Sequence, residues 1–235
     1  MAIPRLLQLA IDNKTTPKTF NVKSEGDTAS VYVYDVIDSY YGVAAQSFVK
    51  TLNDIKANTI HLHINSPGGD VFEARAMVAA IQQHKAQIVA HIDGVAASAA
   101  SYLATACDRV EIVDGAFLMI HNAWSFAMGN AADLRSTAEL LDKVDASIVS
   151  DYAKKTGKDV EQIQQWMANE TWFTSREAVE NGFADAVVES GKDSKTKAAC
   201  NSWNLSAYAN APKGGRDLVD HAANTRARML ALLEK

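Results

Sequence analysis

Three short segments carry residue types that together suit nucleophilic attack on a carbonyl group. Segment 65–70, Asn-Ser-Pro-Gly-Gly-Asp, follows a predicted strand, and its glycines let backbone N–H groups approach a ligand closely. Ser98 follows Gly94 at the predicted start of a helix, and His121 ends an apolar strand. Backbone N–H groups can stabilise an oxyanion, and a serine becomes nucleophilic when a base such as histidine takes its proton.

Each segment alone also has an ordinary structural explanation. The glycines suit a tight turn, Ser98 suits a helix N-cap, and His121 suits a buried histidine with a satisfied hydrogen bond. His121 lies 23 positions after Ser98, which is enough for a helix and two short strands to return the chain to the same place. All three segments fall near the carboxyl ends of successive strands, where parallel sheets place their sites, so their joint occurrence favours a catalytic centre.

The elements that must position these residues follow from hydrophobic periodicity. Apolar runs or alternation predict strands at 30–36, 59–64, 88–92, 110–113, 117–120 and 186–188, with a tight Asp93-Gly94 turn after the third. Helical spacing predicts helices at 42–55, 70–84 with Asp70 as N-cap, 97–107, 131–156, 159–167 and 175–181. Strands that alternate with helices of this length predict an α/β fold with parallel βαβ units.

Four blocks, in order and with compatible spacing, resemble those of the ClpP-type serine peptidases of the crotonase-like superfamily. They are Ile-Asn-Ser-Pro-Gly-Gly at 64–69, Gly-Val-Ala-Ala-Ser at 94–98, Met-Ile-His at 119–121 and Phe-Thr-Ser-Arg-Glu-Ala-Val-Glu-Asn-Gly at 173–182. The resemblance implies a ClpP/crotonase-like fold of repeated βαβ units with a protruding handle helix at 131–156. With its divergent N-terminus and extra tail, the chain looks most like the phage-encoded, ClpP-related head maturation (prohead) proteases.

The resemblance also assigns roles to individual residues. Ser98 matches the nucleophile, His121 the general base, and the backbone N–H groups of Gly69 and Ala99 the oxyanion donors. The acid of the triad is an Asp in the family, and the matching position here is Glu170. A glutamate can orient the histidine as an aspartate does, and the alternative for Glu170 is a solvated carboxylate at a helix end.

The implied function is a serine endopeptidase, with head maturation by cleavage of scaffold and capsid proteins as the preferred role. The expected assembly is a homo-oligomer, in the form of a ring. Ala168 and Asn169 replace a charged pair that senses contact between stacked rings in many ClpP proteins, which puts ring stacking in question. The alternatives are an ATPase-dependent ClpP-like proteolytic subunit that works with an AAA+ unfoldase, and an assembly module whose chemistry has decayed.

Two further enzyme classes fit less well. A relative of the signal-peptide peptidases shares the Ser-Pro-Gly-Gly loop but uses a Ser–Lys dyad, and no lysine lies between Lys85 and Lys143. A hydratase of the crotonase type would use the same oxyanion architecture without a Ser–His pair. His121 stands where a base is wanted, which favours the peptidase.

The composition argues against nucleic-acid-binding, membrane-spanning and secreted proteins. The 23 Lys and Arg against 28 Asp and Glu, with a net charge of −5, argue against a nucleic-acid partner. No apolar run reaches the roughly 18 residues of a membrane span, and no secretory signal is evident. The expected location is therefore the cytoplasm, and the resemblance to phage proteases implies a bacterial host, with the phage procapsid as the site of head maturation.

No cofactor or metal is expected. Cys107 and Cys200 are far apart and predict neither a disulfide framework nor a thiolate zinc site, and Cys107 is interpreted as a small buried side chain. His61 and His63 form half of a possible zinc site without an evident third ligand. Core or subunit contacts are the preferred interpretation of Trp124, Phe126, Trp166, Trp172 and Phe173.

The chain is predicted to have one catalytic domain with two appendages. Residues 1–29 form a divergent N-terminal segment, and 30–189 form the ClpP-like peptidase domain. Residues 190–235 read as a polar linker or loose tail that ends in a short helix near 225–233.

Overall fold

The computed structural model describes residues 5–13, 19–189 and 203–212. These residues form one sheet of eight strands in the order β1-β2-β3-β4-β5-β8, with β6 on β4 and β7 on β6. The strands are β1 (Thr19–Glu25), β2 (Thr28–Tyr34), β3 (Thr59–Ser66), β4 (Gln87–Ala97), β5 (Arg109–Val113), β6 (Phe117–Ile120), β7 (Thr171–Thr174) and β8 (Ala186–Val188). The helices are α1 (Arg5–Asp12), α2 (Ala45–Asp54), α3 (Val71–Gln83), α4 (Ala99–Thr105), α5 (Ala131–Thr156), α6 (Val160–Ala168) and α7 (Ser175–Glu180).

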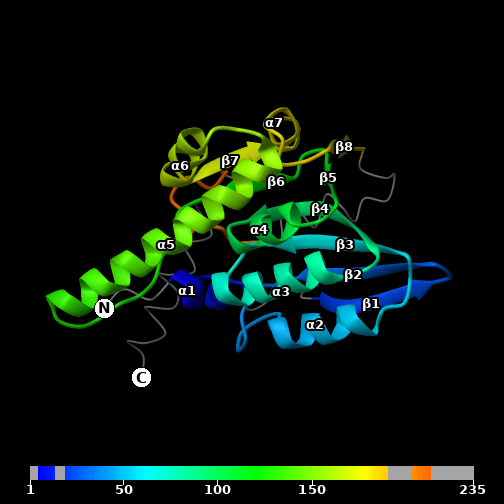
Figure 1. Ribbon diagram of the computed structural model, residues 1–235, viewed down its shortest axis with the longest axis horizontal. Helices are drawn as coiled ribbons and strands as arrows, with labels where there is room; N and C mark the ends of the chain where they lie inside the picture. The colour runs from blue at the N-terminus through cyan, green and yellow to red at the C-terminus, as the bar shows by residue number, and fades with distance from the viewer. Residues whose placement is uncertain (1–4, 14–18, 190–202, 213–235) are drawn as a thin grey trace, which may run out of the picture.

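The predicted α/β fold is confirmed. β2, β3, β4, β5 and β8 pair in parallel along the sheet, and β1 adds an antiparallel edge. Helices α2, α3 and α4 lie side by side along one face of this sheet (Figure 1). The helix predicted from Asp70 begins there, because the Asp70 carboxylate accepts hydrogen bonds from the N–H groups of Phe72 and Glu73.

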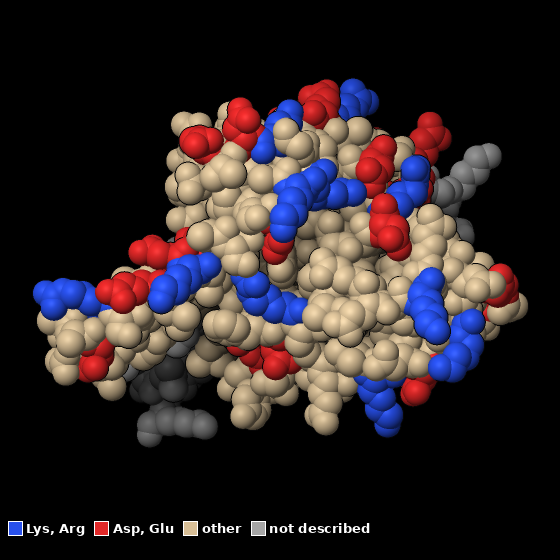
Figure 2. All heavy atoms as spheres, in the orientation of Figure 1, with Lys and Arg blue, Asp and Glu red and all other residues tan. Residues whose placement is uncertain are grey.

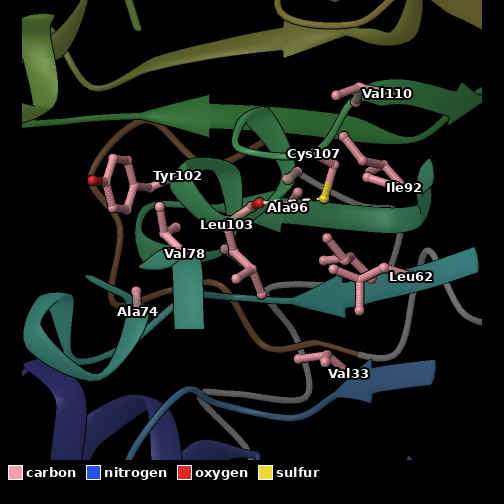
Figure 3. Close-up of a cluster of buried hydrophobic side chains, with 14 of the residues drawn as sticks. Val33, Leu62, Ala74, Val78, Ile92, Ala96, Tyr102, Leu103, Cys107 and Val110 are labelled. Carbon is pink, nitrogen blue, oxygen red and sulfur yellow. Dashed lines mark hydrogen bonds between the residues drawn. The ribbon is translucent and has the colours of Figure 1, made fainter. Parts of the chain in front are cut away.

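The main core fills the space between the sheet and α3 and α4 (Figure 3). Leu62 and Ile92 of the sheet meet Leu103 of α4, and each of these side chains is almost fully buried. Cys107 lies in the same cluster with 5% of its surface exposed, as predicted, and its burial raises the pKa of the thiol.

The predicted turn at Asp93-Gly94 is wrong, because β4 continues through it to Ala97. The first half of β4 pairs with β5, and its second half pairs with β6. On the other side, β3 has an irregularity between Ile64 and Ser66, where Asn65 Oδ1 accepts a hydrogen bond from the N–H of Val95 at 3.2 Å. The ladder contacts on both sides override the local turn preference of Asp-Gly.

Three parts of the structure were not predicted. Helix α1 and strand β1 fall in the segment described only as divergent, and β7, with the sequence Thr-Trp-Phe-Thr, has neither an apolar run nor an alternation of apolar and polar residues. Residues 203–212 were expected in a loose tail, but Trp203 and Tyr208 are buried against the sheet with 8% and 5% of their surfaces exposed. The domain boundaries remain a prediction, and the helix predicted near 225–233 lies outside the described residues.

Helix α5 projects well beyond the body of the molecule (Figure 1). Its observed bounds are those predicted, from a capping box at Asn130 to the left-handed residue Gly157. Its buried side chains all lie in the second half of the helix and are Val144, Ile148, Val149 and Tyr152. The first half is therefore an unpacked extension, as expected of a handle helix.

Acidic and basic side chains alternate over the face shown in Figure 2, with no extended basic surface on it. Among the residues that the structure describes, no helix combines the length and apolar character needed to span a bilayer.

His91 makes the free energy of unfolding depend on pH in the acid range. Its ring stacks on His63 at 4.8 Å, its Nε2 lies 2.9 Å from His61 Nδ1, and its Nδ1 lies 3.4 Å from Glu111. Burial first, and then the neighbouring His63, lower the pKa of His91 to about 4. Since the unfolded state takes up this proton at a higher pH, His91 removes stability as the pH falls from about 6.5 to about 4.

We expect this loss to be on the order of 2 kcal/mol. The His91→Phe variant keeps an aromatic ring on His63 without the titration, so its stability falls less over the same pH range. Urea unfolding of both proteins at about pH 7 and pH 4.5 measures the difference. An equal loss in the two proteins would contradict the assignment.

Candidate active site

The register of three strands brings the predicted site residues to one end of the sheet. β4 pairs in parallel with β6 through Ala97 and Met119, and the N–H of Ser98 donates to the Met119 carbonyl at 2.9 Å. β6 pairs antiparallel with β7 through Ile120 and Thr171. Ser98 and His121 directly follow β4 and β6, and Glu170 directly precedes the antiparallel β7, so all three residues lie at a common edge.

Ser98 and His121 are in direct contact. The distance from Ser98 Oγ to His121 Nε2 is 2.8 Å, within hydrogen-bond range. Neither residue is fully buried, so both are partly open to solvent. This is the arrangement in which a neutral imidazole can take the proton of a serine hydroxyl.

The backbone at Ser98 is strained, with φ 56° and ψ −123°. Ser98 occupies the N-cap position of α4, as the structural alternative predicted, but its side chain makes no capping hydrogen bond. A non-glycine residue in this region costs about 1–3 kcal/mol, which the surrounding structure must offset. The strained turn aims the hydroxyl at His121 and away from the helix.

A buried hydrogen-bond cluster behind Ser98 was not predicted. The Ser101 hydroxyl, fully buried, lies 2.7 Å from the carbonyl oxygen of Ser98, 2.8 Å from that of Met119 and 2.8 Å from the Tyr152 hydroxyl. Burial raises the pKa of Tyr152, so the phenol stays protonated as a donor. The cluster fixes the Ser98 turn to β6 and α5. In the sequence, only its position three residues after the candidate nucleophile could have pointed to Ser101.

The Gly68-Gly69 loop lies directly beside Ser98. Both glycines have positive φ, 91° and 152°, and a Cβ on Gly68 would lie 2.9 Å from Ser98 Cβ. The loop is fixed to Ile37, which donates to the Gly68 carbonyl and accepts from the N–H of Asp70. Within the described residues, the N–H groups of Gly69 and Ala99 donate no hydrogen bond, which leaves them available to a ligand oxygen.

Glu170 is buried, with 9% of its surface exposed, so the alternative of a solvated carboxylate is wrong. Its carboxylate accepts from the N–H of Asn210 at 2.7 Å, the N–H of Ala209 at 3.2 Å and Trp172 Nε1 at 3.4 Å. No hydrogen bond between Glu170 and His121 occurs among the described contacts, although both residues adjoin the last β6–β7 pair, Ile120 with Thr171.

Residues 28–191 match the Clp protease family. The chain belongs to this family. It is 31% identical over 150 residues to the ATP-dependent Clp protease proteolytic subunit 1 of Leifsonia xyli subsp. xyli (strain CTCB07), which covers 63% of this chain and 76% of that protein. It is 33% identical over 137 residues to the subunit of the same name of Corynebacterium jeikeium (strain K411), covering 57% and 73%. A proteolytic subunit 2 from Tropheryma whipplei (strain Twist) is 31% identical over 147 residues, covering 62% and 81%.

This Clp-family peptidase has other polar and aromatic clusters outside the Ser98 site. His61 and His63 face His91, and in the described part of the chain no group of three His, Cys, Asp or Glu side chains is arranged to hold a metal ion. Trp166 and Phe173 pack edge to face at 5.3 Å against the core, as predicted. Trp172 instead lies at the candidate site, beside Glu170.

Gly69→Ala tests the loop of this Clp-family protein. A Cβ there would lie 2.0 Å from the Ile37 carbonyl oxygen, so the loop must move and its N–H with it. We expect peptidase activity to fall by about 100-fold or more, the usual cost of removing an oxyanion donor.

Gly115→Ala is the matched control. Gly115 also has positive φ, 86°, but a Cβ there meets nothing within 4 Å. The Gly115→Ala variant should lose about 1 kcal/mol in its free energy of unfolding and keep its peptidase activity. Peptide hydrolysis and thermal unfolding of both variants separate the two effects, and equal activities would contradict the role of the Gly69 loop.

Proposed function

We propose that this chain hydrolyses peptide bonds with Ser98 as nucleophile, His121 as general base and Glu170 as the acid that orients the histidine. The observation that supports this best is the 2.8 Å contact between Ser98 Oγ and His121 Nε2 at a strained turn. The family match, with relatives named as proteolytic subunits, supports the same chemistry.

The proposed reaction proceeds through an acyl-enzyme. Ser98 Oγ attacks the scissile carbonyl carbon while His121 Nε2 takes its proton, and the carbonyl oxygen becomes an oxyanion. The N–H groups of Gly69 and Ala99 stabilise that charge, at about 3 kcal/mol per donor. The C–N bond then breaks as His121 returns the proton to the leaving amine. A water molecule, activated in the same way, releases the acyl group and restores Ser98.

In this proposal Glu170 stabilises the imidazolium that forms on His121. The last pair of the β6–β7 ladder is Ile120 with Thr171, and His121 and Glu170 are the residues that adjoin this pair in the chain. The longer glutamate side chain reaches the same region from a backbone at φ 48°, another left-handed non-glycine residue. Such strain at two of the three candidate residues fits a functional site.

We consider two biological roles for this peptidase. The relatives named ATP-dependent Clp protease proteolytic subunits favour a subunit that degrades polypeptides delivered by an AAA+ unfoldase. Head maturation, by cleavage of scaffold and capsid proteins in a procapsid, stays a prediction from the sequence resemblance. Cleavage of a folded substrate only with unfoldase and ATP would support the first role, and cleavage of scaffold protein without nucleotide would support the second.

Ser98→Ala should abolish labelling by a fluorophosphonate and reduce peptide hydrolysis by about 10⁴-fold or more, because no other group replaces the nucleophile. Ser125→Ala is the matched control, since Ser125 is an exposed serine in the segment after His121. Labelling followed by gel fluorescence and intact mass checks both variants. If Ser98→Ala labels like the native protein, the proposed mechanism is wrong.

We also propose that the chain forms a homo-oligomeric ring through the handle helix α5. Large apolar side chains are exposed on the protruding half of α5 and on the segment before it, in a pattern typical of subunit contacts. They are Phe126, Met128, Leu134 and Leu140, with 56%, 83%, 46% and 50% of their surfaces exposed.

Replacing Leu134 and Leu140 together by Glu should reduce the assembly mass in light scattering, because burying two charges at a contact is unfavourable. Lys154→Glu is the control, since Lys154 is exposed on the packed half of the same helix. A native protein that is monomeric at micromolar concentration would contradict the ring.

A further inference from the structure

A short segment near the C-terminus, residues 203–210, packs against the candidate active site and is here named the C-terminal strap. Trp203 Nε1 donates to the Asn65 carbonyl at 3.1 Å, and the Tyr208 hydroxyl donates to the Pro67 carbonyl. Asn210 Nδ2 donates to the Asn169 carbonyl at 2.9 Å. Asn65 lies at the end of β3, Pro67 lies in the loop that carries Gly69, and Asn169 precedes Glu170, so the strap ties the two parts of the site together.

The strap supplies most of the hydrogen bonds to the Glu170 carboxylate. One oxygen accepts from the backbone N–H of Asn210 at 2.7 Å and the other from that of Ala209 at 3.2 Å. Two backbone donors, one on each oxygen, fix the plane of a carboxylate that the flexible glutamate side chain would leave free to rotate.

Tyr208 connects the strap to the base and to the oxyanion loop. Its ring, with 5% of the residue surface exposed, packs edge to face on His121 at 5.5 Å and on Trp172 at 5.8 Å. Its hydroxyl holds the carbonyl of Pro67, whose peptide bond leads into Gly68. One side chain therefore limits the movement of both His121 and the loop that ends at Gly69.

We propose that the C-terminal strap is a built-in part of the active site, in which Tyr208 and Asn210 are positioning residues for His121, Glu170 and the Gly69 loop. This inference rests on the proposed peptidase function. It assigns a catalytic contribution to a segment outside residues 28–191, which match the family.

The contacts favour positioning over inhibition. Within the described residues, the strap donates to carbonyl groups and to the Glu170 carboxylate, and it makes no hydrogen bond to Ser98 Oγ or to the N–H groups of Gly69 and Ala99. An inhibitory segment that mimics substrate would occupy those groups, because they are the ones a scissile carbonyl uses.

Asn210→Pro tests the backbone donor, because proline lacks the N–H that bonds Glu170. Asn210→Ala is the comparison variant, since it keeps that N–H and loses only the side-chain contact with Asn169. We expect Asn210→Pro to lower kcat for a short peptide by about 10- to 100-fold with KM within about 2-fold, and Asn210→Ala to lower kcat far less. Thermal unfolding of both variants shows whether each remains folded.

Tyr208→Phe provides a second variant that should fold whatever the proline does. It keeps the ring beside His121 and removes the hydroxyl that holds Pro67, so kcat should fall about 3- to 30-fold at nearly constant KM. Tyr40→Phe is its control, because Tyr40 is 88% exposed and lies outside the strap.

The outcomes separate this inference from the proposed function. A much larger loss of kcat in Asn210→Pro than in Asn210→Ala, together with a loss in Tyr208→Phe that Tyr40→Phe does not show, supports the strap. Unchanged or increased kcat in folded Asn210→Pro and Tyr208→Phe would overturn it, while loss of labelling in Ser98→Ala would leave the peptidase mechanism standing. Labelling that persists in Ser98→Ala would overturn the mechanism itself.

Discussion

The contact between Ser98 and His121 depends on one ladder, the parallel pairing of the second half of β4 with β6. β4 reaches β6 only because it changes partner after Ile92, where its pairing with β5 ends. Ser101 and Tyr152 then hold the Ser98 turn in a conformation that an isolated chain would avoid. The strained serine is thus stabilised by buried hydrogen bonds from two other elements, a common arrangement where geometry must be fixed before a ligand arrives.

Much of this arrangement can be predicted from the sequence, for identifiable reasons. The helix at 131–156 has a long amphipathic pattern with a cap at each end, and its bounds agree with the structure. The Asp93-Gly94 turn was wrong because a local preference was outweighed by strand pairings distant in sequence. Ser98 and His121 were paired correctly in space, since both follow parallel strands. The continuation of β4 through Asp93 and Gly94 depends on pairing with β3 and β6, which a pattern within one segment does not show.

The environment of Glu170 could not be predicted. Its burial comes from β7, whose sequence Thr-Trp-Phe-Thr has neither an apolar run nor an alternation of apolar and polar residues, and from residues 203–210, whose composition resembles a polar tail. Only Trp203 and Tyr208, two large aromatic residues in a polar stretch, hinted that this segment has a packed face. The site is therefore assembled from residues 28–191, which match the family, together with a segment beyond them.

The central claim is that Ser98 is the nucleophile of a hydrolase, activated by His121. Peptide mapping by mass spectrometry after reaction of the full-length protein with a fluorophosphonate tests it most directly. The account predicts a single phosphonylated peptide whose modified residue is Ser98, with no adduct when His121 is replaced by Ala. An adduct on another serine, or a folded protein that takes up no label at Ser98, would contradict it.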